Sequence, residues 1–284
     1  MREFILLALV LLWLPASAET VAITDQHSDQ KYPGKFVWTD LLTTDPDKAA
    51  GFYEHVFGWK PSRVDEDYLI LSNHGRRIAG IARNQAQLAS NESNQWISFI
   101  STSDVKKSHE HLLKSDAQVV AGPVRVEGRG DIGIYVAPDA AVFGIINSSS
   151  GDPEELGADI NDWIWIELWS IDTRAAADFY EFLGYSVEDN WMSDDEDDLL
   201  LADGEIARAG LVKGHESQTK SIWLPYIRVA SLEETIALTN KQGGKYHVLE
   251  GEAHNTGKIA LVSDPTGGLV AIFEAAEEGV EDDQ

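Results

Sequence analysis

The sequence contains no cysteine among its 284 residues, so disulfides, thiol nucleophiles and cysteine-linked lipid anchors are excluded. Positive charge is also scarce, because 22 lysines and arginines stand against 48 aspartates and glutamates, which gives a formal net charge of -26. Nucleic acids and anionic lipid surfaces are bound through clustered basic residues, so this deficit argues against both as partners. An acidic excess of this kind favours solubility.

Long apolar runs are nearly absent as well. The one extended run, at residues 4–14, is too short to cross a bilayer, which needs about 20 residues. It follows Arg2 and precedes Ala16-Ser17-Ala18, the pattern of a cleaved signal peptide over residues 1–18. We therefore predict a periplasmic or secreted protein whose mature chain has no membrane span and is stabilised by its apolar cores.

An internal repeat divides the chain. The segment FVWTDLLTTDPDKAAGFYEHVFGW, which starts at Phe36, recurs as WIWIELWSIDTRAAADFYEFLGY from Trp163, an offset of 127 residues. The closing segments APDAAVFGIIN and DPTGGLVAIFE keep the same offset, which indicates two homologous domains. The predicted division is a signal peptide at 1–18, an N-terminal extension at 19–34, a first domain at 35–148, a linker rich in glycine, serine and acid at 149–161, a second domain at 162–275 and an acidic tail at 276–284.

Each domain again divides into two similar halves. In the first domain, the β-rich apolar segment 35–42 precedes Asp45-Pro46, an N-cap followed by proline in the first helical turn. The predicted helix ends at Gly58, short strands follow it, and a second cycle begins with a strand at Gln95. The pattern predicts four modules, each made of a strand, a helix and three further strands, and hence an α+β fold.

A set of motifs accompanies these modules. W-x-D/E-L is followed by D-x-x-x-A-x-x-F-Y-x-x-x-x-G-W, a second W-I/L-x-F/Y strand and a closing D-P-x-G-x-x-x-x-x-x-E. Over the 240 residues from Lys35 to Glu274, this set resembles the vicinal oxygen chelate superfamily, which includes glyoxalases, extradiol dioxygenases and bleomycin-resistance proteins. The resemblance implies two tandem glyoxalase-like domains, each a pair of βαβββ modules whose curved sheets enclose a cleft, which could pair as a self-contained pseudo-dimer. It fixes no reaction, because one fold hosts many functions.

The same resemblance identifies the positions where metalloenzymes of the superfamily bind one divalent ion, usually through His, Glu or Gln. Motif alignment puts these positions at Trp38, Gly80, Ile97 and Gly144 in the first domain, and at Trp165, Gly210, Leu224 and Ala271 in the second. None of these side chains is a metal ligand, which argues against metal-dependent glyoxalase, fosfomycin-transferase and dioxygenase activity. The eight histidines show no ligand spacing, and neither a G-x-S-x-G elbow nor a phosphate-binding glycine loop occurs. We therefore predict no metal and no cofactor.

The superfamily geometry, combined with strand alternation, implies which side chains line each cleft. Trp38, Asp40 and Leu42 would face Ile97, Phe99 and Ser101 in the first domain, and Trp165, Glu167 and Trp169 would face Leu224, Tyr226 and Arg228 in the second. Aromatic walls with a few polar groups suit a small aromatic or apolar ligand. The predicted ligand-binding residues are Trp38, Asp40, Phe99, Trp165, Glu167, Trp169, Tyr226 and Arg228.

Other roles for these residues remain open. The aromatic rings are equally consistent with a filled apolar core. Asp40 and Glu167 are equally consistent with buried acceptors of structural hydrogen bonds. Glu167 and Arg228 either hold a polar ligand together or neutralise each other. The preferred interpretation is an exported small-molecule-binding protein without the metal site.

Two alternatives belong to other functional classes. The first is a metal-independent lyase or isomerase with Glu167 or Asp40 as the base and with Tyr226 and Arg228 stabilising negative charge. The second is a non-catalytic protein-interaction module. A raised carboxyl pKa at the site would favour the enzyme, and a contiguous exposed apolar patch would favour the interaction module.

Overall fold

The computed structural model describes residues 21–84, 94–155, 157–190, 193, 195–249 and 257–276. The predicted signal peptide and nearly all of the predicted acidic tail lie outside these residues. The first domain consists of β1 (Phe36–Thr43), α1 (Pro46–Phe57), β2 (Lys60–Arg63), β3 (Tyr68–Asn73), β4 (Arg76–Arg83), β5 (Gln95–Ser101), α2 (Val105–Leu112), β6 (Gln118–Val126), β7 (Gly130–Val136) and β8 (Val142–Ser148).

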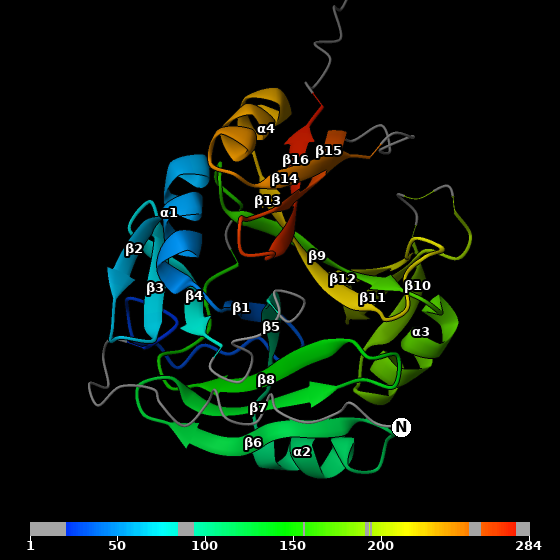
Figure 1. Ribbon diagram of the computed structural model, residues 1–284. Helices are drawn as coiled ribbons and strands as arrows, with labels where there is room; N and C mark the ends of the chain where they lie inside the picture. Colours follow the sequence, from blue (N-terminus) through cyan, green and yellow to red (C-terminus); the bar gives the residue numbers. More distant parts are fainter. Residues whose placement is uncertain are drawn as a thin grey trace, which may run out of the picture.

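The second domain repeats this order. Its elements are β9 (Trp163–Ser170), α3 (Thr173–Phe182), β10 (Ser186–Asp189), β11 (Leu199–Asp203), β12 (Ile206–Lys213), β13 (Ile222–Arg228), α4 (Leu232–Lys241), β14 (Lys245–Val248), β15 (Gly257–Ser263) and β16 (Leu269–Ala275). Each domain forms one eight-stranded mixed sheet, with strand orders β2-β3-β4-β1-β5-β8-β7-β6 and β10-β11-β12-β9-β13-β16-β15-β14 (Figure 1). The predicted α+β fold of two tandem domains with paired βαβββ modules is confirmed.

Side-chain caps explain where the helices begin. Asp45 Oδ1 accepts a hydrogen bond from the backbone N–H of Lys48 at 3.1 Å, and Asp172 does the same for Ala175 at 3.0 Å in the second domain. Gly58 ends α1 with φ at 74°, a left-handed conformation that glycine adopts without strain. The described helices are also too short or too polar to cross a membrane.

The first strand of every module lies at the middle of its sheet. β1 pairs antiparallel with β5 and parallel with β4, so Asp40 is flanked by Ile97 and Gly80. Glu167 on β9 has the matching neighbours Leu224 and Gly210. The predicted site residues therefore lie at the centre of each sheet.

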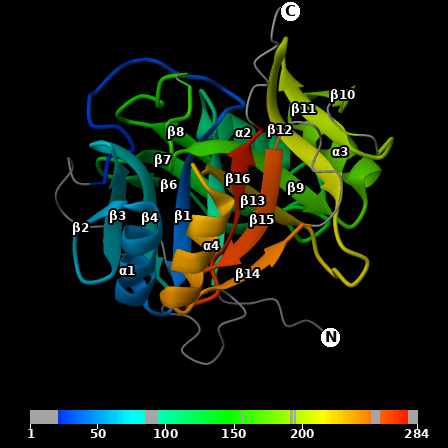
Figure 2. The same cartoon turned by 90° about the horizontal axis from the view of Figure 1, so that it is seen from above.

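The two domains share their apolar cores. One core combines α1 and its strands with residues of the last module, including Val262 and Ile272, and a second combines α2 with α3. Figures 1 and 2 show α1 and α4 side by side. Across this contact the Tyr53 hydroxyl donates to Asp264 Oδ2 at 3.1 Å. The helix-bearing faces of the two sheets are thus buried against each other, and the opposite faces, here called the inner faces, carry the predicted site residues.

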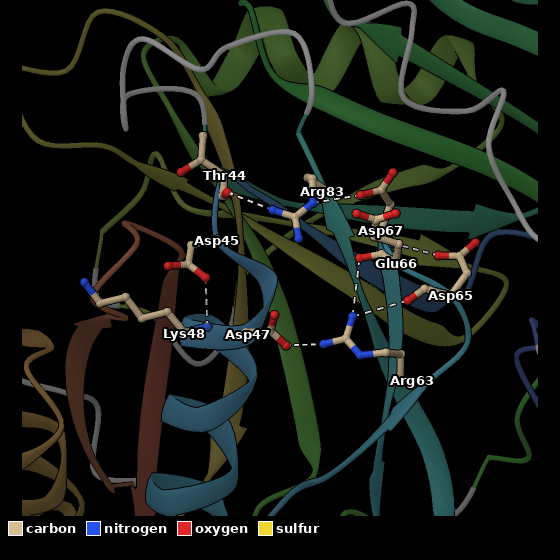
Figure 3. A network of polar contacts seen from close by, with 9 residues as sticks. All are labelled: Thr44, Asp45, Asp47, Lys48, Arg63, Asp65, Glu66, Asp67 and Arg83. Carbon is tan, nitrogen blue, oxygen red and sulfur yellow. Dashed lines mark hydrogen bonds and ion pairs between the residues drawn. The ribbon is translucent and has the colours of Figure 1, made fainter.

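Several surface cations are neutralised locally. Figure 3 shows Arg83 donating to Asp67 Oδ1 at 2.7 Å, while Arg63 donates to the backbone oxygen of Glu66 at 3.3 Å and pairs with Asp47 in the first turn of α1. Exposed pairs of this kind contribute about 0–1 kcal/mol each. The network therefore orients the loop between β2 and β3 more than it stabilises the fold.

Candidate functional site

On the inner face of the first sheet, Asp40 is enclosed by three donors. Its Oδ1 accepts from Trp38 Nε1 at 2.8 Å and from the Tyr68 hydroxyl at 2.7 Å, and its Oδ2 accepts from Arg129 Nη1 at 2.7 Å. Arg129 is 1% exposed, and its guanidinium carbon lies 5.2 Å from the ring centroids of both Trp38 and Tyr68. A complete cation site built from the chain itself therefore occupies this face.

The charge state of this cluster follows from its burial. Burial alone would lower the pKa of the Arg129 guanidinium, but the adjacent Asp40 carboxylate and the Tyr68 hydroxyl raise it overall. Burial raises the pKa of Tyr68 far above its ordinary value, so the hydroxyl stays protonated and donates. The Asp40 carboxylate thus accepts hydrogen bonds from three side chains of its own domain and is not available as a base to an outside molecule.

Part of the predicted N-terminal extension covers the same face. Val21, Ala22 and Ile23 are 0%, 2% and 0% exposed, and Val21 and Ile23 belong to the apolar core of this inner face. The backbone oxygen of Val21 accepts from Arg129 Nε at 3.2 Å, and that of Ala22 accepts from Arg77 Nη1 at 2.8 Å. The extension, which the sequence analysis separated from the first domain, completes its core.

The predicted ligand-binding residues of the first domain are consequently enclosed by protein. Trp38 is 3% exposed, Phe99 is 2% exposed and Asp40 is 9% exposed. Sequence reasoning did not identify Tyr68, Arg129 or the Val21–Ile23 segment as parts of this cluster. The available signal was the apolar Val-Ala-Ile triplet within an otherwise polar extension.

The second sheet differs at the matching positions. Glu167 Oε2 accepts from the Tyr226 hydroxyl through a close hydrogen bond and from Trp169 Nε1 at 3.3 Å. Trp165, Glu167 and Trp169 all retain partial solvent exposure. The structure thus brings together four residues that the sequence analysis singled out: Trp165, Glu167, Trp169 and Tyr226.

The carboxyl group of Glu167 has a pKa above its ordinary value. Its burial raises the pKa, the hydrogen bonds from Tyr226 and Trp169 act in the opposite direction, and the charge of Asp198 raises it further. Burial also raises the pKa of Tyr226 well above its ordinary value, with a further contribution from the Glu167 charge, so Tyr226 is the proton donor in this pair.

Apolar side chains surround this pair without being fully covered. Among the described residues, Leu224, Tyr226 and Ala271 form the buried part of the apolar cluster on this face. The partly exposed members packed against them are Trp165, Trp169, Ile259, Leu261, Leu269 and Phe273. The described part of this face therefore presents an aromatic and apolar surface, with a carboxylate and a phenol at its centre.

Known proteins are similar to this chain in sequence. Residues 35–139 match the model of the Glyoxalase/Bleomycin resistance protein/Dioxygenase superfamily. The anthracycline biosynthesis protein DnrV of Streptomyces peucetius is 24% identical over 270 residues, covering 86% of this chain and 94% of DnrV. The family match and the similarity over most of the chain support membership of the vicinal oxygen chelate superfamily.

Solved structures of the superfamily have the same fold. The Mn(II)-bound glyoxalase from Novosphingobium aromaticivorans superposes with a TM-score of 0.58 at 15% identity, covering 87% of this chain and 84% of the other. A crystal structure of catechol 2,3-dioxygenase gives a TM-score of 0.55 at 12% identity, covering 86% and 94%. At these identities the likeness concerns the fold alone.

The superfamily's metal chemistry does not fit the residues present here. A Cβ atom at Gly80 would collide with the Tyr68 hydroxyl and with Asp40, and one at Gly144 would collide with the Phe99 ring. A Cβ atom at Gly210 would lie 2.9 Å from Glu167 Cγ. Neighbouring side chains thus occupy the space that ligating side chains would need. Within the described residues, no group of three or more His, Asp or Glu side chains is arranged to hold an ion.

Arg228 is held by the linker and not by Glu167. Its Nη1 donates to the backbone oxygen of Ala158 at 2.8 Å, and the β9–β13 register shifts between Tyr226 and Ile227, just before it. Among the described residues, no ion pair joins Arg228 to Glu167. Of the two roles that the sequence left open for this pair, mutual neutralisation does not occur.

Proposed function

We propose that this protein is an exported small-molecule-binding member of the superfamily whose ligand binds to the inner face of the second sheet. The observation that carries the proposal is the difference between the two inner faces. Arg129 and the Val21–Ile23 segment fill the first, whereas Trp165, Trp169 and Phe273 on the second remain partly exposed around Glu167. A small aromatic or apolar molecule would stack on these rings and be oriented by the polar pair.

The export part of the proposal rests on residues 1–18, whose basic start, apolar run and Ala16-Ser17-Ala18 end form a signal peptide pattern. Expression with this leader in a Gram-negative host should give a mature protein beginning at Glu19 in the periplasmic fraction. Intact-mass measurement of the fractionated protein tests this, and an uncleaved cytoplasmic product would contradict it.

A ligand screen tests the binding site. The mature chain is titrated with a library of aromatic compounds, and binding is followed by tryptophan fluorescence and by the unfolding midpoint, which rises when a ligand binds the native state. We expect Trp165→Ala to abolish binding of a hit, and Ile164→Ala, an exposed neighbour on the same strand, to preserve it. A hit that binds the Trp165→Ala variant equally well would place the site elsewhere.

One observation supports a second candidate, a metal-independent lyase or isomerase with Glu167 as general acid or base. Its raised pKa and the hydrogen bond that it accepts from the Tyr226 hydroxyl are typical of an acid–base pair. Mass spectrometry of a bound hit after prolonged incubation distinguishes the two functions. Recovery of the compound unchanged supports binding alone, whereas conversion that Glu167→Gln prevents establishes catalysis.

The protein-interaction alternative has less support. Most of the exposed large apolar side chains lie on separate elements, such as Ile206 on β12 and Leu238 on α4, and the exception is the pair Tyr246 and Val248 on the short strand β14. Isolated exposed apolar residues are ordinary on soluble proteins and do not indicate a docking surface.

A further inference from the structure

The repeat supplies an internal comparison for the site in the second domain. Trp38 and Asp40 correspond to Trp165 and Glu167 at the offset of 127 residues, and each carboxylate lies beside a glycine of the neighbouring strand. In the first domain the carboxylate holds a buried guanidinium, that of Arg129, at 2.7 Å. The first domain therefore shows what the arrangement of tryptophan and carboxylate accommodates, which is an organic cation under an aromatic ring.

The second domain keeps the tryptophan and the carboxylate, as Trp165 and Glu167. Among the described residues, however, no lysine or arginine pairs with Glu167 as Arg129 pairs with Asp40. No lysine or arginine there forms an ion pair with Glu167, and the guanidinium of Arg228 is held by the backbone of Ala158. The sequence position that corresponds to Arg129 is Thr256, outside the described residues, and residues 249–257 contain no lysine or arginine.

Within the part of the chain that the structure describes, the other groups that interact with Glu167 increase the negative potential or are neutral. Tyr226 on β13 and Trp169 on β9 donate hydrogen bonds but carry no charge. Asp198, directly before β11, adds a second negative charge, which acts on both Glu167 and Tyr226. A buried carboxylate is stabilised most by a cation that also makes hydrogen bonds or contacts an aromatic face.

We propose that the inner face of the second sheet binds an organic cation, an ammonium or guanidinium group on a flat apolar scaffold. The cation takes the place beside Glu167 that Arg129 takes beside Asp40, and the scaffold contacts Trp165, Trp169 and Phe273. This inference rests on the proposed small-molecule function and specifies the chemical class of its ligand. The net charge of -26 attracts such ligands over longer distances.

A pair of isosteric probes tests the charge requirement. Trimethylphenylammonium has a permanent positive charge, and tert-butylbenzene has the same shape without it. Titration into the mature chain at fixed ionic strength, followed by tryptophan fluorescence and calorimetry, should show the cation binding at least tenfold more tightly than the hydrocarbon. Glu167→Gln should remove most of that preference while leaving the affinity for tert-butylbenzene nearly unchanged.

A matched variant separates the local charge from the general acidity of the protein. Glu181 lies exposed on α3 of the same domain, on the helix-bearing side of the sheet, so Glu181→Gln removes one negative charge away from the inner face. We expect it to leave the ratio of the two affinities unchanged. An equal effect of the two substitutions would show non-specific attraction and would overturn the proposal.

The pH dependence provides a second readout. Because the probe does not titrate, its affinity should rise with pH as Glu167 ionises, with Tyr226 protonated throughout and Asp198 the other acid nearby. The affinity for Glu167→Gln should stay nearly flat over the same range. If both probes bind equally tightly and Trp165→Ala binds neither, the proposed binding site stands but the requirement for a cation is overturned. Failure of trimethylphenylammonium to bind would also overturn the cation, while the library screen decides the proposed function independently.

Discussion

At the scale of single residues, one repeat position carries two carboxylates with opposite environments. Asp40 is neutralised by a guanidinium from its own domain, whereas Glu167 is surrounded by neutral donors and a further negative charge. A buried ion pair offsets much of its own desolvation, but a buried unpaired carboxylate leaves that cost uncompensated. This difference supports a structural role for Asp40 and the functional role that we propose for Glu167.

The buried pair in the first domain leads to a stability prediction. Arg129→Met leaves the Asp40 charge unpaired inside the protein and should lower the free energy of unfolding by about 3–5 kcal/mol. The double variant Asp40→Asn/Arg129→Met should recover part of this loss, because it removes both charges. Arg125→Met serves as the control, since that side chain is 61% exposed in its pair with Asp131. Urea unfolding of the four proteins measures the differences, and equal losses for Arg125 and Arg129 would contradict the role assigned to the buried pair.

Glu167 leads to a prediction about pH. Burial raises its pKa in the folded protein, so the folded state retains a proton that the unfolded state releases near pH 4.5. The contribution of Glu167 to the free energy of unfolding is fully present below that pH. It is lost as the pH rises through the folded-state pKa, and the loss is about 1.4 kcal/mol for each unit that the pKa is raised. Glu167→Gln should therefore gain stability relative to the unmodified protein across this window. Unfolding free energies measured at several pH values test this, and a pH-independent difference between the proteins would refute it.

Strand alternation allowed part of the site to be predicted from the sequence, because a period of two sends Trp165, Glu167 and Trp169 to one face. Arg129 and Tyr68 were not predictable in the same way. Arg129 lies between two strands, and its contact with Asp40 depends on how distant elements fold together, as does the contact of Tyr68. Local periodicity contains no information about either contact.

At the scale of elements, the Val21–Ile23 segment acts as part of the first domain although it precedes the first strand. Its side chains fill the inner face, and its backbone oxygens satisfy two arginines. Ile23→Ala should therefore cost about 2–5 kcal/mol of stability, the range for truncating a buried isoleucine. Ile206→Ala, at a residue 48% exposed, is the control and should cost less than about 0.5 kcal/mol. Thermal or urea unfolding measures both, and a cost for Ile23→Ala as small as that of the control would show that the segment is dispensable.

Helices with capping residues and strands with alternating apolar residues were predictable from the sequence. Elements that lack these signals were not. The Asp45-Pro46 pair marked the beginning of α1, and Gly58 marked its end. The short strands β2 and β10, with sequences KPSR and SVED, have mostly exposed residues and no apolar pattern. They are strands because they pair with β3 and β11, so only the tertiary structure identifies them.

At the scale of the whole molecule, the two domains are joined by more than the linker. Trp96 Nε1 donates to the Tyr53 hydroxyl, which donates to Asp264 of the other domain, and Trp223 Nε1 donates to Tyr180 in the related position. Both large cores contain residues from both domains. Neither domain can unfold without exposing apolar surface of the other.

This shared packing predicts that the chain unfolds as one cooperative unit. Leu168 is fully buried in a core that contains residues of both domains, so Leu168→Ala should lower the midpoint of the entire transition, at a cost of about 2–5 kcal/mol. Calorimetry and tryptophan fluorescence should show one coincident transition before and after the change, because two-state unfolding gives the same midpoint with every probe. If the domains were independent, the substitution would instead separate the transition into two, with only the second domain shifted to lower temperature. Cooperative unfolding would mean that filling the first domain with Arg129 and the N-terminal segment also stabilises the second domain, where we propose that the ligand binds.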